Sequence, residues 1–115
     1  MERQQGWGRI SKTLARILPF AGRVVIWGAG IHTSQLLART PVLDLCHAEA
    51  IVDSDPQKWG KTISGIPVSS PADIRPSSDL YIVISTFASE GEVYKATAHL
   101  RASGVKVVRL YSGDS

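Results

Sequence analysis

Apolar residues recur along the chain in two alternating patterns, short unbroken runs and longer stripes with helical spacing. The short runs are typical of strands buried on both faces and cover residues 23–27, 48–53, 80–85 and 105–110. The stripes with helical spacing cover residues 7–21, 31–39 and about 90–103. Because strands and helices alternate, we expect parallel strands joined by right-handed crossovers, and therefore a three-layer open sheet of about four or five strands.

Proline, glycine and small polar residues mark the boundaries of these elements. Asp55 and Pro56 predict a single helical turn over residues 55–60, with Asp55 as its cap. Residues 70–74 predict a second brief helix. Residues 63–68 predict one short extended segment at a sheet edge, because Pro67 cannot donate to a strand ladder. Ser89 with Glu92 three residues later predicts a capping box, and Gly104 a helix end.

The first 22 residues form a segment of different character, and we divide the chain there into residues 1–22 and 23–115. Trp7, Ile10 and Leu14 share one side of a helix over residues 7–21, while Arg9 and Lys12 lie mostly on the other. Three interpretations are open. The apolar side of the helix packs on the domain or on a second copy, or it attaches to a membrane surface. Alternatively, the helix once joined the domain to an upstream domain.

Composition narrows the class of protein. A chain of 115 residues, 43% hydrophobic and 20% charged, is ordinary for one soluble domain. The net charge of +3 is uneven, since residues 1–23 carry +4 and the remainder −1, so we expect no nucleic-acid partner. No apolar run reaches the ~20 residues of a spanning helix. The single cysteine, Cys46, excludes an internal disulfide, so we expect a cytoplasmic protein and no metal site.

A glycine-containing turn follows the first strand and opens the second helical stripe. Such a turn brings backbone close to a ligand, and the helix start presents free N–H groups to a phosphate. The predicted contacts are Gly28, Ala29, Gly30, Ile31, His32 and Thr33. Thr33 stands where the dinucleotide fingerprint has a third glycine, which argues against a standard NAD site. The alternative is a tight turn that binds no ligand.

Three polar residues follow other strands at the same predicted edge of the sheet. Asp53 ends the second strand, where a carboxylate can accept hydrogen bonds from ribose, or can cap the following turn. Ser85 and Thr86 lie at the carboxyl end of the strand expected at residues 80–85, which should flank the first strand at the point where strand order reverses, so we expect them to contact the phosphate or sugar of a ligand. The alternative is ordinary loop polarity and helix capping. His32 has a pKa suited to acid–base catalysis, but the sequence offers no partner, so no catalytic residue is predicted.

A series of short motifs resembles a known family. Gly28-Ala29-Gly30-x-His32, residues 52–60, Gly65-Ile66-Pro67-Val68 and residues 70–74 occur in that order. The series resembles the Rossmann-like N-terminal domain of bacterial sugar O-acyltransferases of the sialic-acid type, and it is similar to the C-terminal domain of some sugar C-methyltransferases. The resemblance covers about residues 23–110. It implies that Gly28, Gly30, His32 and Asp53 contact a nucleotide sugar, and it transfers no catalysis.

Three functional hypotheses follow. The first is a module that binds a nucleotide or nucleotide sugar in a carbohydrate or surface-polysaccharide pathway. The second is a ligand-free interaction or regulatory domain, in which residues 7–21 dimerise or dock to a larger enzyme. The third is a small NAD(P)-dependent oxidoreductase, which is disfavoured because the chain has no Tyr-x-x-x-Lys pair and little room for a substrate domain. Whether the protein is an enzyme stays open.

Overall fold

The computed structural model describes residues 2–111, with side chains from residue 6 onward. Its centre is one twisted sheet with the strand order β3-β4-β2-β1-β5-β6. All neighbouring pairs are parallel except β3 with β4. The strands are β1 (Arg23–Trp27), β2 (Ala48–Val52), β3 (Thr62–Ile63), β4 (Ile66–Ser69), β5 (Leu80–Ile84) and β6 (Lys106–Arg109). The sheet therefore has six strands, one more than the upper prediction, and one antiparallel edge.

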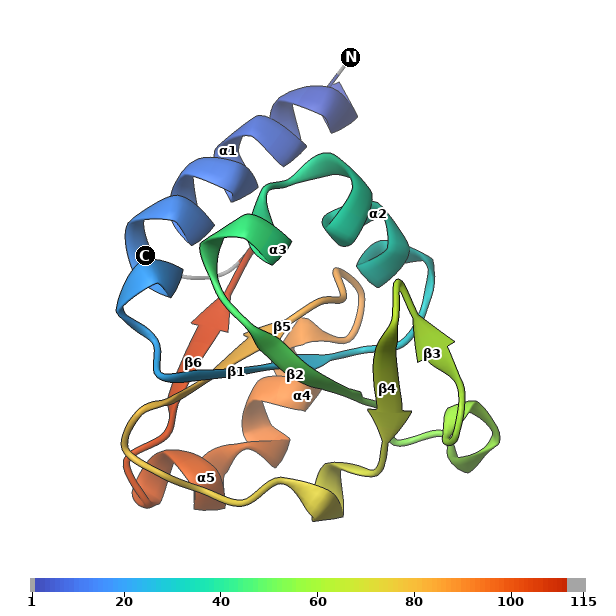
Figure 1. Ribbon diagram of the computed structural model, residues 1–115, viewed down its shortest axis with the longest axis vertical. Helices are drawn as coiled ribbons and strands as arrows, with labels where there is room; N and C mark the ends of the chain where they lie inside the picture. The colour runs from blue at the N-terminus through green and yellow to red at the C-terminus, as the bar shows by residue number, and fades with distance from the viewer. Residues whose placement is uncertain (1, 112–115) are drawn as a thin grey trace.

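Helices cover both faces of this sheet, which gives the predicted three layers (Figure 1). One face carries α1 (Glu2–Ile17), α2 (Ile31–Arg39) and α3 (Val42–Leu45), and the other carries α4 (Glu90–Ala96) and α5 (Ala98–Ala102). Within residues 2–111 there are also three short 3₁₀ turns: η1 (Leu18–Phe20), η2 (Pro56–Lys58) and η3 (Pro71–Asp73). No helix among residues 2–111 has both the length and the apolar character needed to cross a membrane.

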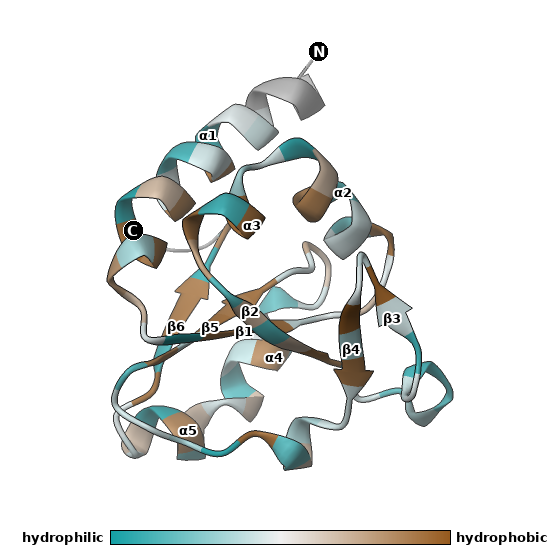
Figure 2. Ribbon diagram, in the orientation of Figure 1, coloured by the Kyte–Doolittle hydropathy of each residue, from teal (hydrophilic) through white to brown (hydrophobic). Residues whose placement is uncertain are grey.

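The central strands β1 and β5 are buried on both faces because helices pack on both faces of the sheet. Val24 and Ile26 of β1 pack into one apolar cluster, whereas Val25 and Trp27 pack into the other. This alternation follows from the two-residue period of a strand. Figure 2 shows the same distribution, with apolar residues concentrated along the strands. The unbroken apolar runs in the sequence thus correspond to strands between two helical layers.

Helix α1 packs its apolar side on the domain itself. Ile10 and Leu14 are at most 1% exposed and share a cluster with strand residues such as Val24. Arg9 donates a hydrogen bond to the carbonyl of Leu110 at 3.1 Å. The helix begins five residues before the predicted start and ends at Ile17, where η1 takes over. Its buried side chains belong to the same core as the sheet.

Three local predictions are wrong, and each has a physical reason. Residues 63–68 are not one extended segment but part of a hairpin, because Ser64 and Gly65 adopt positive φ angles of 51° and 81° and reverse the chain. Ser89 occupies the N-cap of α4 without a side-chain cap bond, so no capping box forms. The last helix is split at Thr97, whose hydroxyl donates to the carbonyl of Tyr94 and competes with the helical bonds.

Candidate functional site

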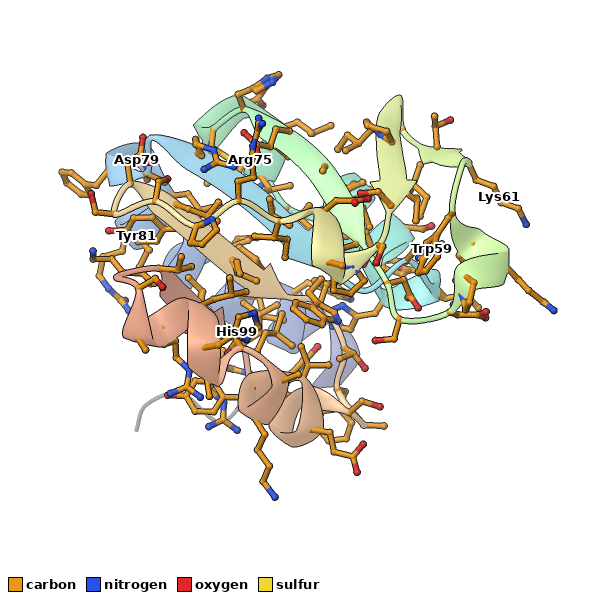
Figure 3. The ribbon with its side chains drawn as sticks, turned by 90° about the horizontal axis from the view of Figure 1, so that it is seen from below. Trp59, Lys61, Arg75, Asp79, Tyr81 and His99 are labelled. Carbon is orange, nitrogen blue, oxygen red and sulfur yellow. The ribbon has the colours of Figure 1, made fainter. Side chains whose placement is uncertain are left out.

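The strand order places a crevice between β1 and β5. From β1 the chain moves to β2 on one side, and it later returns to β5 on the other, so the order reverses between β1 and β5. This confirms the prediction that the strands expected at residues 23–27 and 80–85 are neighbours. Open parallel sheets bind ligands outside the carboxyl ends of their strands at such a point. Figure 3 shows Trp59 and Lys61 at one end of the molecule and Asp79 and Tyr81 at the other.

Gly28 is fixed at the start of the loop by its backbone. Its φ is +128°, a conformation that side chains rarely adopt. Its N–H donates to the carbonyl of Val52 at 2.7 Å, which ties the loop to β2. A Cβ at this position would lie 2.6 Å from the carbonyl oxygen of Ser85. Position 28 therefore requires glycine, whether or not a ligand is present.

The start of α2 leaves backbone donors open. Gly30 is the N-cap, and its carbonyl accepts the N–H groups of Thr33 and Ser34 at 3.2 and 3.3 Å. The N–H groups of Gly30, Ile31 and His32 have no acceptor among the described residues. The first N–H groups of a helix carry partial positive charge and lack intrahelical partners. This is the arrangement on which helix-start anion sites depend.

Lys58 adds a cation beside these donors. Its Nζ lies 3.9 Å from where a Cβ on Gly30 would be, and it is the nearest neighbour of that point. It also lies 3.8 Å from Oδ2 of Asp53, with the lysine side chain 40% exposed. The point where a side chain on Gly30 would begin is thus bordered by an ammonium group, and no apolar side chain outside the neighbouring residues comes within 4 Å of it. No role for Lys58 was predicted, although its spacing in Asp53-x-Asp55-Pro56-x-Lys58 is a signal that could have found it.

Asp53 joins the loop to the turn that carries Lys58. Its Oδ2 accepts the N–H of Ala29 at 2.8 Å, and its Oδ1 accepts the N–H of Asp55 at 2.9 Å. Each carboxylate oxygen can accept a further hydrogen bond. Asp55 accepts the N–H of Gln57 at 3.0 Å, as expected for its cap role. The carboxylate of Asp53 is therefore held in place and keeps acceptor capacity for a ligand.

Thr33 and Ser85 face inward and bind each other. Thr33 is fully buried and Ser85 is 2% exposed, and their hydroxyl oxygens are 2.8 Å apart. Thr33 donates to the carbonyl of Gly28, which can only accept. Since a hydroxyl has one proton, Ser85 must then donate to Thr33. These two predicted contacts hold the glycine loop against β5, and their hydroxyls lie inside the fold and away from its surface.

His32 extends these hydrogen bonds from Ser85 to Tyr111. Its Nδ1 lies 2.7 Å from Oγ of Ser85, and its Nε2 lies 2.5 Å from the hydroxyl of Tyr111. With the Ser85 proton directed at Thr33, Nδ1 donates and Nε2 accepts from Tyr111. Burial lowers the pKa of His32, and the nearby charge of Glu90 opposes that shift. The imidazole is thus held neutral, with Trp7 packed at a ring-centroid distance of 5.2 Å.

A pocket of about 360 Å³ lies beside the glycine loop, on the side of α4. It is lined by residues from the carboxyl ends of β1, β2 and β5 and from α4: Trp27, Gly28, Asp53, Ser54, Thr86, Ser89, Glu92, Val93 and Ala96. Three predicted site residues, Gly28, Asp53 and Thr86, therefore share one pocket. The loop residues from Ala29 to Thr33, together with Ser85, lie outside its lining. Glu92, which the sequence analysis placed in a helix cap, lines the pocket instead.

Comparisons with known proteins agree with this architecture. Residues 20–108 match the model of an N-terminal domain described as C2185-like. The chain belongs to the C2185-like family. No curated protein matches it. Among solved structures, this C2185-like chain is similar to UDP-D-quinovosamine 4-dehydrogenase from Vibrio fischeri, with a TM-score of 0.54, 22% identity and 77% of each chain covered.

The structural likeness supports the Rossmann-type fold and no more, because the identity is low. The finer resemblance to sugar O-acyltransferases and C-methyltransferases stays a prediction.

Among the described residues, no group of three or more histidine, cysteine or acidic side chains could hold a metal ion.

Proposed function

We propose that this C2185-like domain binds a nucleotide or nucleotide sugar at its glycine loop. The open N–H groups from Gly30 to His32, with Lys58 beside them, carry the proposal. They combine hydrogen-bond donors with positive charge, which suits a phosphate or diphosphate. The pocket next to them holds Asp53, whose spare acceptor capacity suits the hydroxyls of a sugar ring.

The comparison supports the class of ligand. The similar protein from Vibrio fischeri is named for a UDP-sugar, so the same fold occurs in a protein of nucleotide-sugar metabolism. We propose a role in a carbohydrate or surface-polysaccharide pathway and take uridine-diphosphate sugars as the first probes. The earlier alternatives, an NAD(P)-dependent oxidoreductase and a ligand-free interaction domain, are tested by the same experiment.

A thermal-shift panel with UDP-glucose, UDP-N-acetylglucosamine, NAD, NADP, acetyl-CoA and S-adenosylmethionine tests the proposal. A ligand at 100 times its dissociation constant stabilises the folded state by about 2.7 kcal/mol. For a domain of this size such a gain raises the melting temperature by roughly 10–20 °C. A shift with NAD or NADP alone would favour the oxidoreductase, and no shift with any compound would favour the interaction domain.

Gly30→Val locates the binding site. Its φ of −112° and ψ of −160° accept a β-branched side chain, and the nearest neighbour of the new Cβ would be Nζ of Lys58. The variant should fold but lose the ligand-induced shift, because the side chain would fill the phosphate position. Gly8→Val, in α1 with nothing within 4 Å of its Cβ position, is the control and should keep the shift. A full shift in Gly30→Val would refute this placement.

The role of residues 7–21 in dimerisation or docking also stays a proposal. Because Ile10 and Leu14 are buried in the core, removing the helix would unfold the domain and would test nothing. A partner would instead meet the exposed side, where Lys12 and Arg16 lie. Sizing of the full chain, compared with a variant carrying Lys12→Glu and Arg16→Glu, tests this role. A mass of one chain in both proteins would count against a homodimer.

A further inference from the structure

The pocket beside the glycine loop is acidic, in contrast to the loop itself. Its charged lining residues are Asp53 and Glu92, and its other polar lining residues are the hydroxyl-bearing Ser54, Thr86 and Ser89. No lysine or arginine of the described part of the chain lines it. Carboxylates at neutral pH accept hydrogen bonds and repel anions. The two neighbouring regions therefore suit different parts of one ligand.

The two carboxylates are not equivalent. Asp53 is compensated by the N–H groups of Ala29 and Asp55 and by the ammonium group of Lys58 at 3.8 Å. Glu92, on α4, makes no salt bridge within the part of the chain that the structure describes. The uncompensated negative charge of the pocket is thus mainly that of Glu92.

Resting on the proposed function, we propose that this pocket takes an uncharged, hydroxyl-bearing sugar ring of the ligand, and that Glu92 selects against a ring carrying a negative charge. The apolar wall formed by Val93 and Ala96 suits the carbon face of such a ring. The volume of about 360 Å³ is near the lower end for small-molecule pockets, which are roughly 300–1,000 Å³. It accepts a part of a nucleotide sugar, while the phosphates remain at the loop.

The ribose and the hexose of a nucleotide sugar are both uncharged, hydroxyl-bearing rings, so either could occupy the pocket. Two pairs of ligands distinguish the two rings. UDP-glucose and UDP-glucuronic acid differ by a carboxylate on the hexose. NAD and NADP differ by a phosphate on the ribose. Dissociation constants for all four, measured by calorimetry at low ionic strength, are compared between the wild-type protein and Glu92→Gln. Asp44→Asn is the matched control, because it removes the same charge from an exposed position on α3, which covers the opposite face of the sheet.

Because Glu92 is exposed, the charged member of at least one pair should bind roughly fivefold more weakly than the neutral member in the wild-type protein. Glu92→Gln should remove most of that difference, and Asp44→Asn should leave it unchanged. The pair that responds identifies the ring in the pocket.

Equal binding within both pairs in the wild-type protein would overturn the proposal, and so would a difference that persists unchanged in Glu92→Gln. If the protein binds nucleotides without such discrimination, only this inference fails. If it binds none of the four ligands and nothing in the thermal-shift panel, the proposed function fails with it.

Discussion

A methyl group at position 28 should destabilise the domain strongly, whereas a methyl group at position 30 should not. Gly28 has a φ of +128°, and alanine in a rarely populated backbone region costs on the order of 1–3 kcal/mol. Its Cβ would lie 2.6 Å from the carbonyl oxygen of Ser85, which forces the end of β5 to move. Overpacking of this kind costs roughly another 1–3 kcal/mol. Together the two effects reduce the free energy of unfolding by about 2–6 kcal/mol.

Gly30 lies two residues away in the same loop and gives the opposite expectation. Its extended backbone is open to any residue, and nothing but Nζ of Lys58 comes within 4 Å of its Cβ position. Gly30→Ala should leave the folded state intact. Alanine restricts the unfolded chain, which stabilises by about 0.4–1 kcal/mol, but it is a poorer N-cap residue than glycine, and the two effects roughly offset each other.

Urea unfolding followed by circular dichroism measures both variants against the wild-type protein. A domain of this size has a free energy of unfolding of roughly 5–15 kcal/mol, so a loss of several kcal/mol in Gly28→Ala moves the midpoint far to lower urea. Gly30→Ala should unfold close to the wild-type midpoint. Equal midpoints for the two variants would refute the loop geometry from which both the candidate site and the Gly30→Val experiment are derived.

Three further predictions concern individual side chains. Arg23 donates two hydrogen bonds to Glu49, at 2.7 and 3.2 Å, and so lowers the pKa of that carboxyl. The stability lost in Glu49→Gln should therefore be constant above about pH 5. It should shrink as the pH falls through the lowered pKa. Unfolding midpoints across this range check it, and a difference unchanged in acid would contradict it. Burial lowers the pKa of His32, so its contribution is complete above about pH 6.5 and declines as the pH falls through the lowered pKa. His32→Asn should lack that decline between neutral and mildly acidic pH, and an identical pH profile would exclude the effect. Asp55→Ala should cost about 1 kcal/mol through loss of the cap on Gln57, and unaltered thermal stability would show that the cap contributes little.

The sequence predicts the central strands well because their signal is local and redundant. The apolar runs at 23–27 and 80–85 match β1 and β5 to within a residue. The antiparallel edge is missed because it depends on two residues, Ser64 and Gly65, whose positive φ angles interrupt a stretch that otherwise looks extended. Helix α3 is also missed because of a single residue. Pro41 predicts the end of one helix, but it also serves as the N-cap of the next.

The candidate site is predicted in part. Gly28 and Asp53 are found because each has a local signature, a glycine turn after a strand and an acid at the end of the next strand. Lys58 lies within the motif of residues 52–60, which is a usable signal, although no role was predicted for it. Glu92 has no such signal, because its relation to the pocket arises only when α4 packs beside the sheet. Contacts between residues so far apart leave no periodic trace in a single sequence.

The threonine at position 33 shows how a departure from a motif can be explained by packing. In the dinucleotide fingerprint the third glycine lets the helix approach the strand closely. Here the hydroxyl of Thr33 bridges the carbonyl of Gly28 and the hydroxyl of Ser85, and Ser85 in turn bonds His32. The helix start is thus anchored to β1 and β5 by the protein's own hydrogen bonds. Because the loop is held without a ligand, a phosphate would meet donors already in position, and binding would lose little free energy to ordering the loop.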